Sequence, residues 1–334
     1  MGLLGSLFKP RVEKLAESGD AEGLEAILQS DAKSEDRVAA IGALVELDGP
    51  GSSGVLVAVL GDGDPTVDMA AEHALRSLGA DAADALGSVL GQPIGDRALG
   101  LLRELGDACA EPLSNAATDD DESCRHRAIS GLLDLAAATD DETTHELCFR
   151  TILAALGDRA PACRAQAAAG LAAFGDPRAA KALAAQLKDG DETVRTACRD
   201  TLSGMGTPTL PFLVDALADR NPNSKLLAAG LLAEIDAEPA EVQDHQAALV
   251  TLLDLINVDD DVLRTSVAAA VARIPAAEVI DAQLERLEDP NSDEREETEG
   301  LVRQLLEYGV MDPPQRQAAE QRLNRILTAD PDES

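Results

Sequence analysis

Residues Asp191 to Gly206 read D-E-T-V-R-T-A-C-R-D-T-L-S-G-M-G, which is the pattern of one short amphipathic helix. Asp191 can cap the amino end of this helix, and Gly206 can end it with a left-handed turn. Apolar residues occur at Val194 and again four, eight and eleven residues later, so they share one face of an α-helix. The same pattern recurs along almost the whole chain.

We call the residue that corresponds to Val194 in each recurrence the anchor. The anchors are Arg37, Val67, Ile94, Cys124, Cys163, Val194, Ser224, Leu263 and Glu297. They are 27 to 39 residues apart, and shorter amphipathic stretches such as 177–187 and 210–217 lie between them. Each repeat is therefore predicted to be a pair of antiparallel helices, and a period near 30 residues predicts an all-α solenoid.

The predicted array has about nine helix pairs and is a single continuous domain over residues 1–328. An N-terminal cap is expected at 1–30 and a capping helix at 310–328, because the end repeats of a solenoid must cover its core. The last residues, 329–334, are acidic and are expected to be a disordered tail.

The segment 175–195, G-D-P-R-A-A-K-A-L-A-A-Q-L-K-D-G-D-E-T-V-R, with the helix that continues to Gly206, resembles HEAT repeats of the short type first associated with phycobilin lyase subunits. The resemblance covers roughly residues 20–310. In that family an Asp before and an Arg after the anchor commonly form a ladder between repeats, and Asp191 and Arg195 match this pair. Asp68 and Gly95 stand where the Arg is expected, so the resemblance implies that the ladder is interrupted in the second and third repeats.

The net charge of the chain limits the kinds of partner that are expected. The 334 residues include 62 acidic and 28 basic side chains, for a formal net charge of −34. Nucleic acids and anionic membranes bind through Lys and Arg, so neither is expected as a partner. An acid-rich, lysine-poor surface resembles that of proteins from extreme halophiles and indicates a haloarchaeal source. Binding of a basic partner is the alternative explanation.

The cysteines and the opening residues favour the cytoplasm over a secreted or membrane location. Five cysteines are an odd number, and they lack the spacing of a small secreted scaffold. No apolar run approaches the roughly 18 residues of a membrane span. The opening residues lack the charged region and cleavage site of a secretory signal; Leu4, Leu7 and Phe8 are expected to cover the end of the array. We therefore expect a cytoplasmic monomer.

Sequence motifs for catalysis are missing. The chain has no P-loop, dinucleotide-binding glycine pattern or nucleophile elbow. Deoxyhypusine hydroxylases, which are iron-containing HEAT enzymes, require four His-Glu pairs, and only His145-Glu146 occurs here. Cys124, His126, His145 and Cys148 are zinc-type residues, but Cys124 is an anchor, where core packing is the expected role. No catalytic residue, metal or cofactor is therefore predicted.

The remaining function is binding. In arrays of this kind the second helix of each pair generally lines the concave face, and its outward positions lie two, five, six and nine residues after the anchor. These positions are unexpectedly uncharged for so acidic a chain, and two interpretations stay open: an apolar groove that docks an amphipathic helix, or tight packing between neighbouring helices. The expected contact residues are Met69, His73, Arg76, His126, Ile129, Leu133, Arg199 and Leu226.

The sequence thus predicts a non-enzymatic scaffold that binds a protein or peptide on its concave face. The alternatives are a HEAT-type enzyme, either metal-dependent or lyase-like, and an acidic chaperone for basic proteins. The identity of the partner is left open.

Overall fold

The structure is a computed structural model that describes residues 11–235, 252, 261–273, 276–288, 295–308 and 311–328. Every regular element within these ranges is an α-helix or a short 3₁₀ helix, and the prediction of an all-α solenoid is confirmed. None of the described helices has the length and apolar content needed to cross a membrane. The chain forms two compact units, Met1–Phe174 and Gly175–Ser334, and the single continuous array over 1–328 stays a prediction.

Unit 1 is a stack of helix pairs. Its α-helices are α1 (Arg11–Ser18), α2 (Ala21–Leu28), α3 (Ser34–Asp48), α4 (Ser53–Val59), α5 (Pro65–Leu78), α6 (Ala83–Gly87), α7 (Gly95–Glu104), α8 (Ala110–Ala116), α9 (Glu122–Ala138), α10 (Glu142–Ala155) and α11 (Pro161–Gly170). The 3₁₀ helices are η1 (Gly49–Ser52), η2 (Gly79–Ala82), η3 (Gly106–Cys109) and η4 (Leu171–Phe174).

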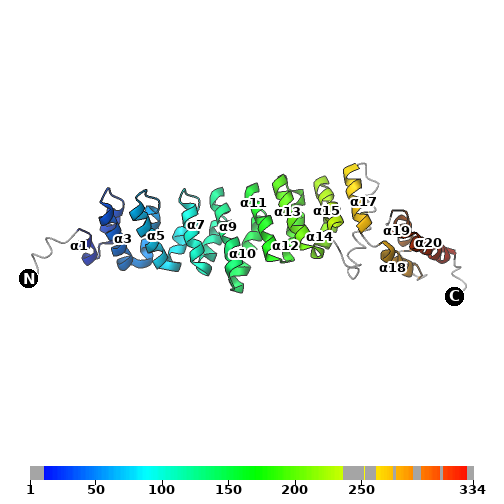
Figure 1. The fold of residues 1–334 in the computed structure, drawn as a ribbon, viewed down its shortest axis with the longest axis horizontal. Coiled ribbons are helices and arrows are strands. Elements are labelled where there is room, and N and C mark those ends of the chain that lie inside the picture. Colours follow the sequence, from blue (N-terminus) through cyan, green and yellow to red (C-terminus); the bar gives the residue numbers. More distant parts are fainter. Residues whose placement is uncertain are drawn as a thin grey trace, which may run out of the picture. The chain divides into compact units, whose positions relative to one another are not determined.

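Contacts between elements define the pairs of unit 1. Helix α2 pairs with α3, α4 with α5, α6 with α7, α8 with α9, and α10 with α11. The second helices α3, α5, α7, α9 and α11 also contact one another in that order, and so do the first helices α4, α6, α8 and α10 (Figure 1). Unit 1 therefore has two layers, one of first helices and one of second helices.

Unit 2 repeats this arrangement. Its elements are α12 (Arg178–Ala185), η5 (Gln186–Lys188), α13 (Glu192–Met205), η6 (Thr207–Thr209), α14 (Leu210–Leu217), α15 (Pro222–Glu234), α17 (Asp261–Arg273), α18 (Ala276–Glu288), α19 (Arg295–Tyr308) and α20 (Pro313–Thr328). Helix α12 pairs with α13, α14 with α15, and α18 with α19.

Helix α20 lies where the capping helix was predicted. It contacts α18 and buries Ala319, Leu323 and Ile326. The predicted tail at 329–334 and the apolar residues Leu4, Leu7 and Phe8 lie outside the described residues.

Helix α13 shows why the recurrent pattern folds as it does. The Asp191 carboxylate accepts hydrogen bonds from the backbone N–H groups of Thr193 and Val194, at 2.8 and 3.4 Å, and so caps the helix. Val194, Cys198 and Leu202 are fully buried. The predicted left-handed C-cap is wrong in detail at Gly206, because φ is 68° but ψ is −141°. This conformation turns the chain directly into η6 and is almost restricted to glycine.

The first repeat has a different register from the predicted one. The fully buried residues of α3 are Ala40 and Leu44, whereas Val45 is partly exposed. This moves the anchor by one residue, from Arg37 to Asp36. The sequence pattern was misleading because Ile41 and Val45 have the required spacing from Arg37, just as Ala40 and Leu44 have it from Asp36. In the corrected register Arg37 directly follows the anchor, as Arg195 follows Val194.

Candidate functional site

The eight predicted contact residues are divided between the two units. Met69, His73 and Arg76 lie on α5, and His126, Ile129 and Leu133 lie on α9, all in unit 1. Arg199 and Leu226 lie in unit 2, on α13 and α15; Arg199 is exposed and pairs with Asp200, and Leu226 is half-buried. Within unit 1, α5 and α9 are separated by α7, which contacts both helices.

The exposed members of this set share one side of their helices. Met69 is 71% exposed, and His73 and Arg76 follow it at helical spacing and are exposed as well. His126 is the equivalent of Met69 on α9, two residues after the anchor, and it too is exposed. These four residues are accessible to a partner.

Ile129 is not accessible, and its prediction as a contact residue needs correction. The side chain is fully buried, and α9 contacts the second helices α7 and α11. Leu133 is half-buried, and a Cβ atom added to Gly170 would lie 2.5 Å from its Cδ2. Helices α9 and α11 therefore approach closely at this point.

Tight packing also accounts for much of the apolar stripe. The positions equivalent to Ile129 in other repeats are buried at Leu99, Ala168 and Ala229. Among the described residues the large apolar side chains that are exposed are Leu47 and Met69. The second helices thus leave small residues and isolated apolar side chains at the surface of the described chain.

Ion pairs connect the exposed side chains of α5 and α7. Arg76 Nε lies 2.7 Å from Glu104 Oε2 and its Nη1 lies 3.3 Å from Glu72 Oε2. Arg97 binds two acids of α5, with 2.8 Å between Nη1 and Asp68 Oδ2 and 2.6 Å between Nη2 and Glu72 Oε1. Two arginines and three acids therefore link one repeat to the next.

The same kind of connection continues from α7 to α9. Arg127 Nε lies 2.7 Å from Asp96 Oδ1, and its Nη1 donates to the Leu90 carbonyl at 2.8 Å. Arg103 lies 2.5 Å from an Asp134 oxygen. We define the α5–α7–α9 face as the surface made by these ion pairs, the pairs of Arg76 and Arg97, and the exposed Met69, His73 and His126.

The α5–α7–α9 face is nearly balanced in charge. Its ion pairs contain four arginines (76, 97, 103 and 127) and five acids (68, 72, 96, 104 and 134). Hydrogen bonding to Arg76 lowers the pKa of Glu104, and hydrogen bonding to Arg127 lowers the pKa of Asp96, so both acids are ionised at neutral pH. This face differs from the chain as a whole, in which acids outnumber bases by more than two to one.

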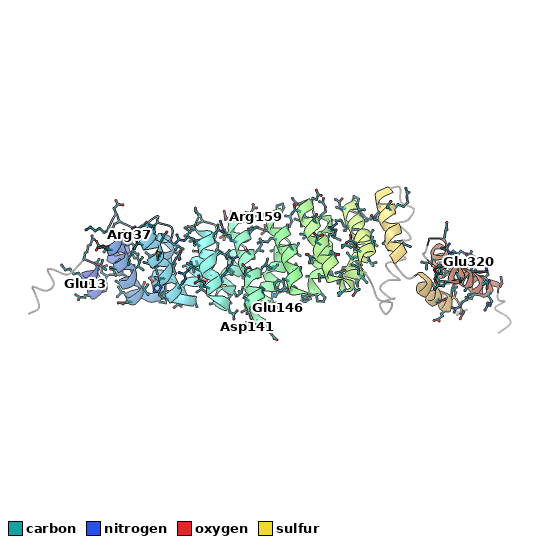
Figure 2. The ribbon with its side chains drawn as sticks, in the orientation of Figure 1. Glu13, Arg37, Asp141, Glu146, Arg159 and Glu320 are labelled. Carbon is teal, nitrogen blue, oxygen red and sulfur yellow. The ribbon has the colours of Figure 1, made fainter. Side chains whose placement is uncertain are left out.

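A second network lies at the edge where the first helix of each pair turns into the second. Arg125, Arg164 and Arg195 directly follow their anchors, and the Nη1 of each donates to two carbonyl groups of the preceding loop. Figure 2 shows Arg37 and Arg159 at this edge of unit 1, with Asp141 and Glu146 at the opposite edge. These arginines hold the loops onto the second helices.

Aspartates in the same loops were missed by the sequence reasoning. Asp119, Asp158, Asp189 and Asp219 each accept a hydrogen bond, at 2.7 to 2.9 Å, from the backbone N–H of the residue two positions later. All four lie five residues before their anchors. That constant offset is visible in the sequence and would have identified them.

The family resemblance implied a ladder between repeats made by residues such as Asp191 and Arg195, but Asp191 caps its own helix and Arg195 binds loop carbonyls. Ion pairs between repeats are made instead by aspartates that lie five residues before an anchor. Arg125 binds Asp158 of the next repeat, and Arg37 lies 2.6 Å from Asp62 of the next repeat. Asp68 departs from the pattern as expected, since its Oδ1 accepts from the backbone N–H of Gly61 and Asp62. The link between α5 and α7 is then made by Arg97.

The cysteines are part of the core. All five are buried free thiols. Burial raises the pKa of Cys109 and of Cys148 to about 11, and that of Cys198 to about 12, which disfavours the nucleophilic thiolate. His145 packs edge-on against Phe174, with 5.1 Å between ring centroids. In the described part of the chain no group of three or more His, Cys, Asp or Glu side chains is placed to hold a metal ion.

Comparison with known proteins gives one match to a family model. Residues 149–233, which are 85 of the 334 residues, match the family model of HEAT repeats. No curated protein matches the chain. One similar solved structure is the crystal structure of an engineered protein from a structural genomics consortium, at 19% sequence identity and a TM-score of 0.35, over 95% of this chain and 91% of that one. The family match, together with the repeated helix pairs of both units, supports a HEAT-repeat protein.

Proposed function

We propose that the chain is a non-enzymatic scaffold that binds a protein or peptide partner through the α5–α7–α9 face. HEAT repeats are generally protein-interaction scaffolds, which supports binding as the class of function. The contact residues we propose on this face are Met69, His73, Arg76 and His126, with Leu133 as a further candidate. Arg199 and Leu226 lie in unit 2 and are not part of this face. Ile129 is replaced in this role because it is buried.

The observation that supports this face most is its cross-linking by ion pairs. Arg76, Arg97, Arg103 and Arg127 each bind an acid on a neighbouring second helix, so the exposed side chains of three repeats are held in place before any partner arrives. A preorganised surface loses less conformational entropy on binding. Each single exposed ion pair contributes little, but a network fixes geometry.

Charge and side-chain chemistry indicate what such a face would accept. The near balance of arginines and acids reduces the repulsion that an average protein would meet elsewhere on this acidic chain. Met69 supplies an exposed flexible apolar side chain, a type common at binding surfaces. The proposed partner therefore presents an apolar residue flanked by charges of both signs.

A site-specific crosslinking experiment tests the proposal. A photoreactive residue at His73, which is exposed on the same side of α5, should capture a defined partner from cells of the source organism, and adding Met69→Glu should abolish capture. Thr196 is the matched control, because it is exposed and also lies two residues after its anchor. If Met69→Glu and Thr196→Glu variants captured the same partners equally well, this face would not be the binding surface.

We further propose that the repeats are of the short phycobilin-lyase-like type and that the protein is a cytoplasmic monomer from a salt-adapted organism, with no nucleic acid or membrane partner. The loop-binding arginines that follow the anchors and the charge of −34 support these points. An acidic chaperone would instead bind basic proteins with an affinity that falls steeply as salt rises. Measuring the salt dependence of partner binding separates the two functions.

A further inference from the structure

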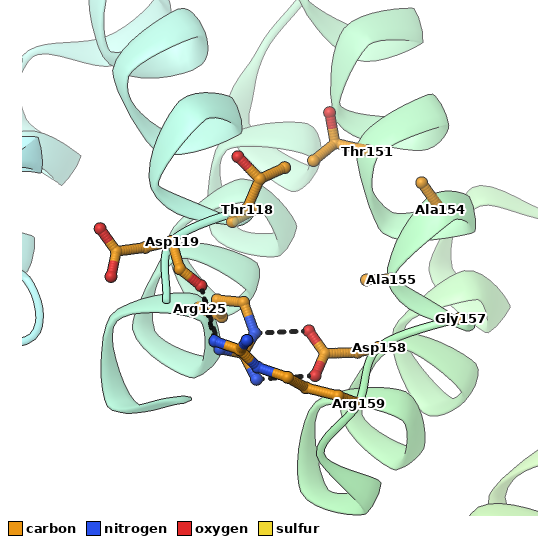
Figure 3. A pocket seen from close by; sticks show the side chains of 10 residues that line it. Thr118, Asp119, Arg125, Thr151, Ala154, Ala155, Gly157, Asp158 and Arg159 are labelled. Carbon is orange, nitrogen blue, oxygen red and sulfur yellow. Dashed lines mark hydrogen bonds and ion pairs between the residues drawn. The ribbon is translucent and has the colours of Figure 1, made fainter. Parts of the chain in front are cut away.

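A cavity of about 310 Å³ lies between the carboxyl ends of α8 and α10 in unit 1. Figure 3 shows its lining, which comes from the ends of these helices, the start of α9 and the loop before α11. Ala117 and Ala155 are buried, whereas Thr118, Ala154 and Gly157 are exposed. The cavity is therefore open to solvent and partly lined by small side chains. Its volume is at the lower end of the range of ligand pockets, roughly 300–1,000 Å³.

The charged side chains around this cavity are already paired. Arg125 forms two hydrogen bonds with the buried Asp158, and Arg159 lies 3.5 Å from the exposed Asp120 carboxylate. The Asp119 carboxylate points away from the cavity in Figure 3. The two arginines are therefore balanced by two acids, and the cavity offers no surplus charge to an ionic ligand.

The hydroxyl groups of the wall are also satisfied. Thr151 shares a hydrogen bond with Ser114 at 2.8 Å, and Thr118 donates to the Asn115 carbonyl at 2.8 Å. Every polar side chain that lines the cavity thus has a hydrogen-bond partner within the protein. A ligand in this cavity would mainly gain apolar contact with its small side chains.

Comparison with the other repeats explains why unit 1 has a cavity at this point. Seven residues before the anchor, four repeats have a leucine that is at most 3% exposed: Leu60, Leu156, Leu187 and Leu217. The first and third repeats have connections of other lengths and bury Leu28 and Leu90 near the end of the first helix. In the fourth repeat the same position is Ala117, which has a methyl group in place of an isobutyl group. Because Ala117 lines the cavity, the cavity lies beside the missing leucine side chain.

From this pattern we infer that the cavity is a binding site for a leucine side chain that a protein partner inserts. The isobutyl group takes the place that a leucine of the chain itself has in the other repeats, against Ala117, Ala154 and Ala155. Cavities left by a missing core leucine bind small apolar molecules. The exposed pair of Arg159 and Asp120 gives this apolar centre a polar rim, as protein interfaces commonly have. This site is separate from the α5–α7–α9 face, and the inference does not depend on that face.

Two neutral peptides and an alcohol test the inference on the full-length protein. The peptides are N-acetyl-Gly-Leu-Gly-amide and N-acetyl-Gly-Ala-Gly-amide, and the alcohol is 3-methylbutan-1-ol. Methyl NMR signals of Ala117, Ala154 and Ala155 should shift saturably with the leucine peptide. The alanine peptide should bind at least about tenfold more weakly, because it buries less apolar surface. Absence of saturable shifts, or equal affinity for both peptides, would overturn the inference. Tighter binding of the alcohol than of the leucine peptide would overturn the assignment to a protein side chain.

Ala117→Leu supplies the isobutyl group from the chain itself. The variant should have a melting temperature higher by about 2 °C or more, and the leucine peptide should no longer shift the signals of Ala154 and Ala155. Ala137→Leu is the matched control, because Ala137 is exposed on α9 and does not line the cavity; it should change neither result. A lower melting temperature for Ala117→Leu would show that the cavity does not fit a leucine side chain. Retention of peptide binding by this variant would show that the peptide binds elsewhere.

Discussion

Arg125 and Asp158 form a buried ion pair between consecutive repeats, with 2.7 Å from Nε to Oδ2 and 2.9 Å from Nη2 to Oδ1. Their side chains are only 5% and 6% exposed. The remaining polar atoms are also satisfied, because Arg125 donates to the carbonyls of Asp119 and Asp120, and Asp158 accepts from the backbone N–H of Ala160. Because every nitrogen and carboxylate oxygen of the pair has a hydrogen-bond partner, the cost of removing both charges from water is offset.

Removing one member of this pair should therefore destabilise unit 1 strongly. We expect Asp158→Asn to lower the free energy of unfolding by about 3 kcal/mol, because it leaves Arg125 buried without a counter-ion. Urea denaturation followed by circular dichroism measures the change. Asp200→Asn, which breaks the exposed pair with Arg199, should cost no more than about 0.5 kcal/mol. Similar losses in both variants would contradict the assignment of a structural role to the buried pair.

Low pH should weaken the ion pair between Arg125 and Asp158 and so reduce stability. Burial tends to raise the pKa of Asp158, but hydrogen bonds from Arg125 and the Ala160 N–H outweigh it, and the net pKa is lowered. The folded state then holds its proton less tightly than the unfolded state, so stability is fully present above the unfolded pKa, near 4. It is lost as the pH falls through the lowered folded pKa. Stability measured from pH 7 down to pH 2 should fall less steeply in Asp158→Asn; an identical slope would exclude this contribution.

Substitution by glutamate should destabilise the protein strongly at a buried position and hardly at an exposed one. Ile129→Glu places a carboxylate in a fully buried position and should cost more than about 4 kcal/mol or prevent folding. Met69→Glu changes a side chain that is 71% exposed and should alter stability by less than about 0.5 kcal/mol. Melting temperatures of the two variants provide the measurement. A well-folded Ile129→Glu protein would mean that α9 packs differently from the arrangement described.

The five thiols should be unreactive in the folded protein. All are buried, and the raised pKa of Cys109, Cys148 and Cys198 leaves little thiolate at pH 8. Ellman's reagent should label them slowly under native conditions, and denaturant should release five fast-reacting thiols. Rapid labelling of any thiol without denaturant would reveal local opening of its repeat.

Gly206 should be difficult to replace. Its φ of 68° with ψ of −141° strains any residue that has a Cβ atom, so Gly206→Ala should cost about 1 to 3 kcal/mol. Gly204 lies two residues earlier, within α13, and a Cβ atom there would meet open space. Gly204→Ala should therefore stabilise the helix by up to about 1 kcal/mol. Chemical denaturation should show a lower free energy of unfolding for Gly206→Ala and a higher one for Gly204→Ala. Equal changes in both variants would contradict the backbone conformation described for Gly206.

Much of the fold could be predicted because its signals are local. The capping role of Asp191, the buried Val194, Cys198 and Leu202, and the positive φ of Gly206 all follow from residues within one helix. Because the same local pattern recurs in repeat after repeat, the prediction of the fold is more reliable than any single helix would allow. The first repeat shows the limit, since Arg37 is buried only because the Leu28 carbonyl and Asp62 accept its hydrogen bonds.

The candidate surface could be predicted only in part. Helical periodicity placed Met69, His73 and His126 on an outward side, and these residues are exposed. It also placed Ile129 outward, because periodicity within one helix does not reveal where the next helix lies. Burial at this position is decided by the neighbouring second helices.

The sequence by itself therefore determined the repeat, the all-α architecture and the caps, since each depends on contacts within one helix or one turn. Only the tertiary structure decided which arginines meet which acids, that Arg125 and Asp158 are buried together, and that Arg125 and Arg159 converge on one carbonyl oxygen. The relations between repeats join residues 25 to 39 positions apart, and their geometry depends on how one repeat packs on the next.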